Sequence, residues 1–166
     1  MPDSVIHAQF MAEAIQLATV SFERGGGPFG ALIVRDGTVI GRGLSLAELT
    51  SDPTAHAEVN AIRAAASHLK TIDLGDCIAY SSAEPCPMCL AACYWARIPR
   101  VYFGSSIADT VKYGFEDEYV YHELSRPSGL RSVAMTQLLK DAANDALERL
   151  RPRIQRPTFL PIDWQK

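Results

Sequence analysis

Two short motifs with metal-binding side chains constrain the fold of this chain, because they can act only if folding brings them together. Residues 54–60 read TAHAEVN, and residues 85–89 read PCPMC. Each motif lies at the expected start of a helix, and an expected strand precedes each helix in the sequence. If both helices begin at the same edge of the sheet, the two motifs meet there.

The second motif has the spacing of a metal-binding cysteine pair. Cys86 and Cys89 fall on the first turn of their helix, where residues three apart face the same way, so both sulfurs can contact one ion. The free N–H groups of a first turn favour thiolates, and Pro87 suits the first helical position because its missing N–H does no harm there. Two thiolates and a histidine suit zinc. His56 is the expected third ligand, because it stands at the start of its own helix.

The remaining histidines and cysteines fit this ion poorly: His7, His68, His122, Cys77 and Cys93. His68 lies more than three turns from the start of its helix, and the other two histidines have no ligand-like context. Cys93 is about 10 Å of helical rise beyond Cys86, and Cys77 begins the preceding strand. We expect both cysteines to be small buried hydrophobic residues. Three protein ligands leave one zinc position open for water, which is the arrangement of a catalytic site.

Glu58 adds a proton carrier to the expected metal site. It stands two residues from His56, so it can reach the open position without being a ligand. A carboxylate there can take a proton from water and pass it to a leaving group. Two alternatives stay open: a thiol–disulfide site at residues 86–89, and a structural zinc, which requires a fourth protein ligand.

Hydrophobic spacing and turn residues predict alternating helices and strands. Residues 4–24 have helical spacing, and residues 29–45 read as a hairpin that turns at Asp36-Gly37. A helix is expected to open with Asp52 as its cap and Pro53 just inside. Further strands are expected near residues 76–83, 100–106 and 132–137, with helices at 87–96 and 136–153, a short helical turn at 107–114, and an irregular acidic stretch at 115–124. This alternation predicts one α/β domain over residues 1–151, with helices on both sides of a sheet, and a proline-rich tail over residues 152–166.

Composition argues mildly against a nucleic-acid partner, although a local basic patch is compatible with an acidic average. The 166-residue chain has a formal net charge of −3 and is 48% hydrophobic, so it lacks the basic balance typical of proteins that bind a phosphate backbone. It has no apolar run of membrane-spanning length and no signal-peptide pattern. Four cysteines, two of them three apart, indicate metal or redox chemistry in a reducing compartment, so we expect a cytoplasmic protein.

Most of the chain resembles the cytidine deaminase-like superfamily. The matching blocks read PFGALIV, DPTAHAEVNAIRAA, EPCPMCLAA and ARIPRVYFGSS. His-x-Glu with Pro-Cys-x-x-Cys is the signature of its zinc-dependent nucleobase deaminases. The resemblance implies a three-layer α/β/α fold with a mixed central sheet of about five strands, a zinc cofactor, and hydrolysis of an exocyclic amino group to ammonia.

Two branches of this superfamily share the DPTAHAE block: tRNA adenosine deaminases and bacterial-type guanine deaminases. Residues 94–124 resemble the guanine branch, in which a tryptophan follows the cysteine helix and a GF(D/E)D segment follows the next strand. By that resemblance Asp117 assists guanine recognition or proton transfer, and a small-molecule base is expected rather than a nucleic acid. An acidic acceptor suits the N–H and amino edge of guanine.

One position departs from both branches. They commonly place an asparagine after the second strand, in a G-x-N pattern, where this chain has Ser45. A serine offers one hydroxyl in place of an amide that both donates and accepts. Alternative substrates therefore stay open, among them guanosine, another aminopurine, cytosine, an ammeline-like triazine and, with less support, the adenosine of a tRNA.

Four further positions are candidates for substrate contact. Phe29 and Trp95 can stack on a flat ring, although core packing would explain either. The backbone N–H groups near Ala57 can stabilise a developing oxyanion. Relatives in the guanine branch close the active site with the C-terminal segment, so Trp164 in the tail is a candidate lid residue. The resemblance also implies a homodimer, with tail swapping between subunits as one possible form and a simple packing strap as the alternative.

Overall fold

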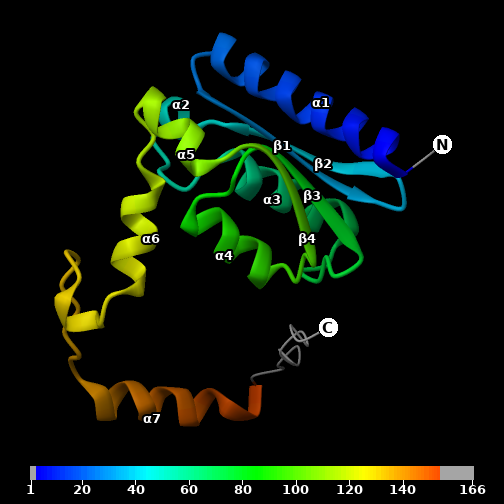
Figure 1. The fold of residues 1–166 in the computed structure, drawn as a ribbon. Coiled ribbons are helices and arrows are strands. Elements are labelled where there is room, and N and C mark those ends of the chain that lie inside the picture. The colour runs from blue at the N-terminus through cyan, green and yellow to red at the C-terminus, as the bar shows by residue number, and fades with distance from the viewer. Residues whose placement is uncertain (1–2, 154–166) are drawn as a thin grey trace. The chain divides into compact units, whose positions relative to one another are not determined.

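The computed structural model describes residues 3–153 (Figure 1). The chain falls into two units, divided between His122 and Glu123. The first unit contains most of the regular structure, and helix α6 crosses the division. Its elements up to α6 are α1 (Asp3–Glu23), β1 (Gly27–Arg35), β2 (Thr38–Ser45), α2 (Ala47–Thr50), α3 (Ala57–Leu69), β3 (Cys77–Ala83), α4 (Pro87–Trp95), β4 (Arg100–Ser105), α5 (Ile107–Thr110), η1 (Val111–Tyr113) and α6 (Asp117–Ser125).

The first two strands form the predicted hairpin. Asp36 and Gly37 both have positive φ, at 48° and 73°, as a two-residue turn between antiparallel strands requires. Arg35 pairs with Thr38 across the turn, and the pairing continues to Gly27 and Ser45 with two register shifts. The hairpin therefore brings the start of β1 and the end of β2 to one edge of the sheet.

The sheet has the order β2-β1-β3-β4 and is mixed: β1 runs antiparallel to β2 and β3, whereas β3 and β4 are parallel. The ends of β2, β3 and β4 thus lie at the same edge as the start of β1. The expectation of about five strands was wrong, since the described part of the chain has four. Residues 132–137, the expected extra strand, form no strand. Their apolar side chains lie in solvent, with Val133 74% and Met135 70% exposed, so burial offers no reason for them to join a sheet.

Helices cover both faces of the sheet, as the three-layer prediction requires (Figure 1). Successive residues of a strand point to opposite faces, and β1 shows this alternation. Ala31 and Ile33 pack with alanines of α3, whereas Leu32 and Val34 pack with α1. The two hydrophobic clusters lie on opposite sides of the sheet, and α3 and α4 share one side.

Helix α3 lies very close to strand β2, because the strand presents glycines to the helix. A Cβ atom on Gly43 would lie only 1.9 Å from the carbonyl oxygen of Ala57, and one on Gly41 would lie 2.4 Å from that of Ala61. Alanines at 57, 61 and 65 face the sheet and keep the helix surface flat. Small residues on both elements therefore seat the first turn of α3 directly on the sheet.

Two predicted boundaries in the first unit were wrong. Helix α3 begins at Ala57, and Asp52 and Pro53 lie before it in a turn of their own. Residues 117–125 form helix α6, where an irregular stretch was expected. Asp117 and Glu118 occupy its first turn, where carboxylates favour a helix start by interacting with the positive end of the helix dipole.

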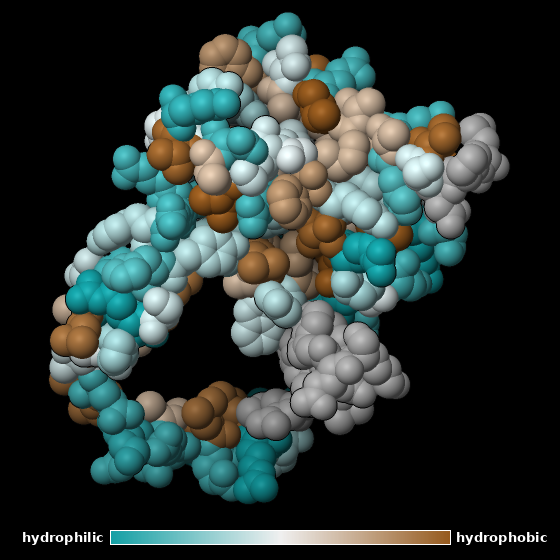
Figure 2. Space-filling view, in the orientation of Figure 1, coloured by the Kyte–Doolittle hydropathy of each residue, from teal (hydrophilic) through white to brown (hydrophobic). Residues whose placement is uncertain are grey.

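The second unit, as far as it is described, contains the end of α6, the 3₁₀ turns η2 (Ser128–Leu130) and η3 (Arg151–Arg153), and helix α7 (Lys140–Leu150). Helix α7 lies within the helix predicted for residues 136–153. On the face drawn in Figure 2, hydrophobic residues are interspersed with hydrophilic ones. Among residues 3–153, no helix is both long and apolar enough to cross a membrane.

Candidate functional site

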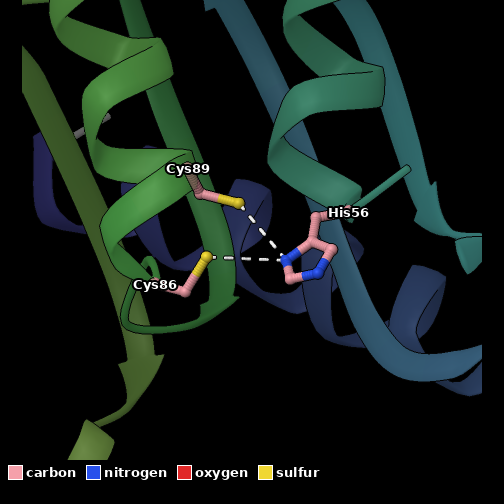
Figure 3. Close-up of side chains that lie close together, drawn as sticks. All are labelled: His56, Cys86 and Cys89. Carbon is pink, nitrogen blue, oxygen red and sulfur yellow. Dashed lines mark hydrogen bonds between the residues drawn. The ribbon is translucent and has the colours of Figure 1, made fainter. Parts of the chain in front are cut away.

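His56, Cys86 and Cys89 come together at the sheet edge where α3 and α4 begin (Figure 3). His56 is the N-cap residue of α3, and Cys86 is the N-cap residue of α4, with Pro87 following at the first helical position as predicted. The Nδ1 atom of His56 lies 3.5 Å from the Sγ of Cys86 and 3.6 Å from the Sγ of Cys89. The ligand atoms of all three residues lie within 4.8 Å of one another.

The spacing of these three atoms fits zinc. Tetrahedral coordination with Zn–S near 2.3 Å and Zn–N near 2.0–2.1 Å places sulfur and nitrogen about 3.6 Å apart, close to the separations observed here. The hydrogen bond from Cys89 lowers the pKa of Cys86 to about 4, and the same bond, together with burial, raises the pKa of Cys89. A cation is therefore needed to stabilise a second thiolate beside the first. Two sulfurs and one imidazole nitrogen are ligands that would bind zinc.

The other two cysteines belong to the core, as expected. Cys77 and Cys93 are buried in the hydrophobic cluster on the α3 side of the sheet. Burial raises the pKa of each thiol to about 12, so both stay protonated near neutral pH. Among the described residues, no fourth histidine, cysteine or carboxylate joins the group formed by residues 56, 86 and 89. A closed structural zinc site is therefore not formed by residues 3–153.

A cavity of about 390 Å³ opens beside this group, and Glu58 lines it together with His56 and Cys86. Glu58 stands in the first turn of α3 and is only 7% exposed. Burial raises the pKa of its carboxyl above the ordinary value, because a buried carboxylate loses hydration. The Oγ of Ser81 on β3 donates a hydrogen bond to its Oε1 at 3.0 Å. The cavity wall therefore combines two of the three metal-binding residues with a carboxyl group suited to proton transfer.

Most of the residues proposed for substrate contact line the same cavity. Phe29, Ser45, Ala57 and Asp117 all contribute to its wall. Asp117 is the first residue of α6, and burial raises the pKa of its carboxyl group. Phe29 also packs against the core cluster, so the packing and cavity interpretations both hold for its position.

The structure describes only one of the two tryptophans proposed for substrate contact. Trp95 is the last residue of α4, is 67% exposed and does not belong to the cavity wall. Trp164 lies outside the described residues. The substrate-binding roles of both residues stay predictions.

Three further residues, in the cavity wall or at the metal-binding turn, were not among the predicted site residues, although Phe115 belongs to the GF(D/E)D segment. Phe115 lines the cavity, and its ring meets that of Phe29 edge to face at a centroid distance of 4.8 Å. The buried Thr110 also lines it. Tyr121 anchors the metal-binding turn, since its hydroxyl donates to the carbonyl oxygen of Pro85 at 2.8 Å. These contacts join segments that lie far apart in the sequence, and only the resemblance over residues 94–124 directed attention to the region.

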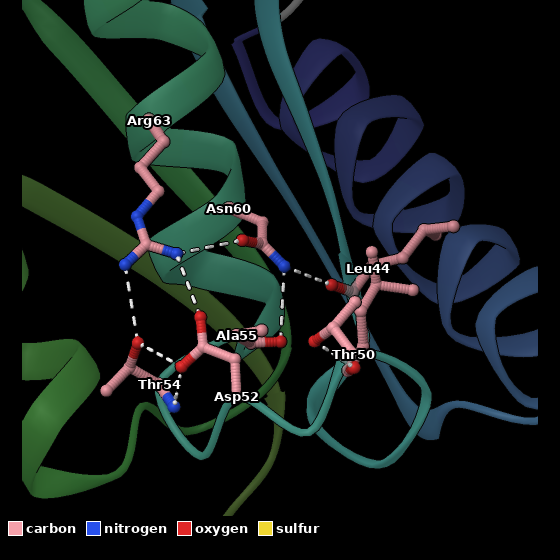
Figure 4. Close-up of polar contacts among 8 residues, drawn as sticks. Leu44, Thr50, Asp52, Thr54, Ala55, Asn60 and Arg63 are labelled. Atoms are coloured by element: carbon pink, nitrogen blue, oxygen red, sulfur yellow. Dashed lines mark hydrogen bonds and ion pairs between the residues drawn. The ribbon is translucent and has the colours of Figure 1, made fainter.

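Polar contacts stabilise the turn that precedes His56 and helix α3 (Figure 4). The carboxylate of Asp52 accepts from the backbone N–H of Thr54 at 2.8 Å and from its hydroxyl at 2.6 Å. Arg63, two turns into the helix, donates to the Thr54 hydroxyl at 3.3 Å. Asp52 thus stabilises this turn, where it had been expected to cap the helix.

Asn60 connects the same turn to the sheet (Figure 4). Its side-chain amide donates to the carbonyl oxygens of Leu44, at 2.9 Å, and Ala55, at 3.1 Å. Leu44 precedes Ser45 and Ala55 precedes His56. The Asn60 side chain therefore holds the backbone next to Ser45, which lines the cavity, and next to His56, which belongs to the metal-binding group.

Comparison with known proteins agrees with this geometry. The family model described as cytidine and deoxycytidylate deaminase zinc-binding region matches residues 4–105. The chain is similar to guanine deaminase of Bacillus subtilis, with 44% identity over 133 residues that cover 80% of this chain and 85% of the relative. It is also similar to tRNA-specific adenosine deaminase of Haemophilus influenzae, with 36% identity over 137 residues and 79% of each chain covered.

The fold agrees with a solved structure as well. The X-ray structure of guanine deaminase from Bacillus subtilis superimposes with a TM-score of 0.86 and 39% identity, covering 93% of this chain and 99% of the other. The shared fold and the His-Cys-Cys group at the edge of the mixed sheet give one conclusion: this chain belongs to the cytidine and deoxycytidylate deaminase family of zinc-binding enzymes.

Proposed function

We propose that this enzyme deaminates guanine to xanthine and ammonia by hydrolysis. The observation that carries the proposal is the position of Glu58, which is buried in the wall of the cavity that also holds His56 and Cys86. The similarity to guanine deaminase over 80% of the chain supports the substrate. A cavity of about 390 Å³ lies at the small end of the range for small-molecule sites, about 300–1,000 Å³, and suits one bicyclic base.

His56, Cys86 and Cys89 would hold the zinc, which when bound supplies a Lewis acid that makes water nucleophilic near neutral pH. Glu58 takes one proton from the attacking water and delivers it to the amino nitrogen of the base. A bond forms between the water oxygen and the ring carbon that carries the amino group, the carbon–nitrogen bond breaks, and ammonia leaves. Backbone N–H groups at the first turns of α3 and α4, near Ala57 and Cys86, stabilise the negative charge that develops on oxygen.

Recognition of guanine falls to residues on the other walls of the cavity. The Asp117 carboxylate accepts hydrogen bonds from the N–H and amino edge of the base and assists proton delivery to the leaving nitrogen. Phe29 and Phe115 supply apolar ring surface for the flat heterocycle. Ser45 contributes a single hydroxyl in place of the amide common in relatives, so it is the position at which substrate preference can differ.

The charge of the chain favours a free base over a tRNA as the substrate. The formal net charge of −3 gives no support to an RNA-binding surface. We further propose a homodimer, in line with the resemblance to the guanine branch. The division into residues 1–151 and a tail at 152–166 that closes a site stays a prediction, since residues 154–166 lie outside the described part.

The test is ammonia release from purified zinc-loaded protein given guanine, guanosine, adenine, cytosine and ammeline side by side. Release from guanine alone supports the proposal and shows that Ser45 is a tolerated replacement. Release from a different ring, with guanine inert, contradicts guanine as the substrate and points to Ser45 as the cause of the changed preference. If the whole panel is inert and a tRNA releases ammonia with a strong dependence on salt, the tRNA alternative replaces this proposal.

A further inference from the structure

Ser81 is a buried hydroxyl on the face of the sheet that supports α3. It lies in β3 opposite Ala31 of β1 and is 1% exposed. The neighbours that share its face along the strand are alanines, Ala79 and Ala83. A hydroxyl placed in apolar surroundings is costly unless it has a hydrogen-bond partner. Its partner is Glu58, whose Oε1 lies 3.0 Å from the Ser81 Oγ.

This hydrogen bond joins helix α3 to strand β3, in addition to the bond that Asn60 of α3 makes to strand β2. Glu58 stands on α3, and Ser81 belongs to a central strand with hydrogen-bonded neighbours on both sides. A glutamate side chain has several rotatable bonds, so burial by itself does not fix the orientation of its carboxylate. The strand provides a rigid donor for one carboxylate oxygen, because Ser81 is enclosed and its backbone is fixed by the sheet.

We propose that Ser81 is a positioning residue for Glu58, holding the carboxylate in the orientation needed for proton transfer. The inference rests on the proposed function, since it concerns how Glu58 performs that reaction. Ser81 does not line the cavity, so it acts through Glu58 and not through the substrate. It follows that its removal lowers kcat and leaves KM nearly unchanged.

The chain offers a matched control in the next residue of the same strand. Ser82 points to the opposite face, and its Oγ accepts a hydrogen bond from the backbone N–H of Gly30 at 3.1 Å. Ser82→Ala and Ser81→Ala each remove one hydroxyl from β3, but only Ser81→Ala removes the contact with Glu58. A difference between the two variants is therefore due to that contact and not to a general loss of strand stability.

The kinetic test uses zinc-loaded wild type, Ser81→Ala, Ser82→Ala, Glu58→Gln and the Ser81→Ala/Glu58→Gln double variant, with guanine as substrate. Ser81→Ala is expected to lower kcat about 10- to 100-fold, the effect of losing one hydrogen bond to a charged group, with zinc content per chain equal to that of Ser82→Ala. In the Glu58→Gln background the same change should have little further effect. Equal kcat for Ser81→Ala and Ser82→Ala, or an undiminished effect in the double variant, would overturn the proposal.

A second readout does not depend on substrate. Crystal structures of Ser81→Ala and Ser82→Ala should show the Glu58 carboxylate reoriented or in several conformers in the first and fixed in the second. An unchanged, single Glu58 conformer in Ser81→Ala would overturn the positioning role. If the wild type fails to release ammonia from guanine, the proposed function is wrong, and the crystal structures alone decide the role of Ser81.

Discussion

Helix α3 lies so close to strand β2 that Gly43→Ala is expected to lower the stability of the fold. The added Cβ would lie 1.9 Å from the carbonyl oxygen of Ala57, whereas ordinary van der Waals contact begins at 3.4 Å. The start of the helix and the strand must separate by about 1.5 Å to relieve this overlap. The neighbouring atoms belong to the helix backbone, so no flexible side chain can move aside. Overpacking of a tight interior typically costs about 1–3 kcal/mol, and backbone contact places this substitution at the upper end.

Ala57, whose backbone would be displaced, is the neighbour of His56. Gly43→Ala is therefore expected to weaken zinc binding as well as folding. A loss of about 3 kcal/mol lowers Tm by about 6–12 °C in a chain of this size. Thermal denaturation measures the first effect, and zinc content after dialysis against a weak chelator measures the second. Gly41→Ala, where the nearest helix atom is 2.4 Å away and lies one turn further from His56, should cost less and keep more zinc.

Gly129→Ala is the control for a general effect of replacing glycine. No atom lies within 4 Å of a Cβ at Gly129, so this variant should keep the Tm and the zinc content of the wild type. If Gly43→Ala melts within about 2 °C of the wild type and keeps its zinc, the close contact between α3 and β2 does not exist in solution, and the argument fails.

Three further predictions concern single side chains. Glu58→Gln should keep zinc bound, because Glu58 is not part of the ligand group, while ammonia release falls about 10²- to 10⁴-fold; intact turnover in the zinc-loaded variant would refute its role. Tyr121→Phe removes the hydroxyl that donates to the carbonyl oxygen of Pro85 and should cost about 1 kcal/mol in urea denaturation, and an unchanged midpoint would contradict the importance of this anchor. The hydrogen bond from the backbone N–H of Ser132 is the main factor that lowers the pKa of Glu123 from 4.5 to about 2. The stabilisation that the ionised Glu123 carboxylate gives the folded state is therefore complete above pH 4.5 and is lost as the pH falls through about 2. Carboxyl NMR titration checks the last point, and a midpoint near 4.5 would show that the hydrogen bond is absent.

The sequence by itself determined the metal-binding group and the local elements that present it. Pro87 after Cys86, the Cys-x-x-Cys spacing and the Asp36-Gly37 turn act through local backbone geometry, and local geometry can be read from neighbouring residues. Boundaries were less accurate where two local interactions competed. Asp52 can cap a helix or close a turn with Thr54, and the structure has the turn.

Only the tertiary structure decided which distant residues share the cavity. The edge-to-face contact of Phe29 with Phe115 and the hydrogen bond from Ser81 to Glu58 depend on how strands and helices pack, and residue spacing gives no sign of either. The number of strands was also decided by tertiary partners. The residues around Val133 have apolar side chains suited to a strand, but a strand forms only where another strand offers its backbone hydrogen bonds.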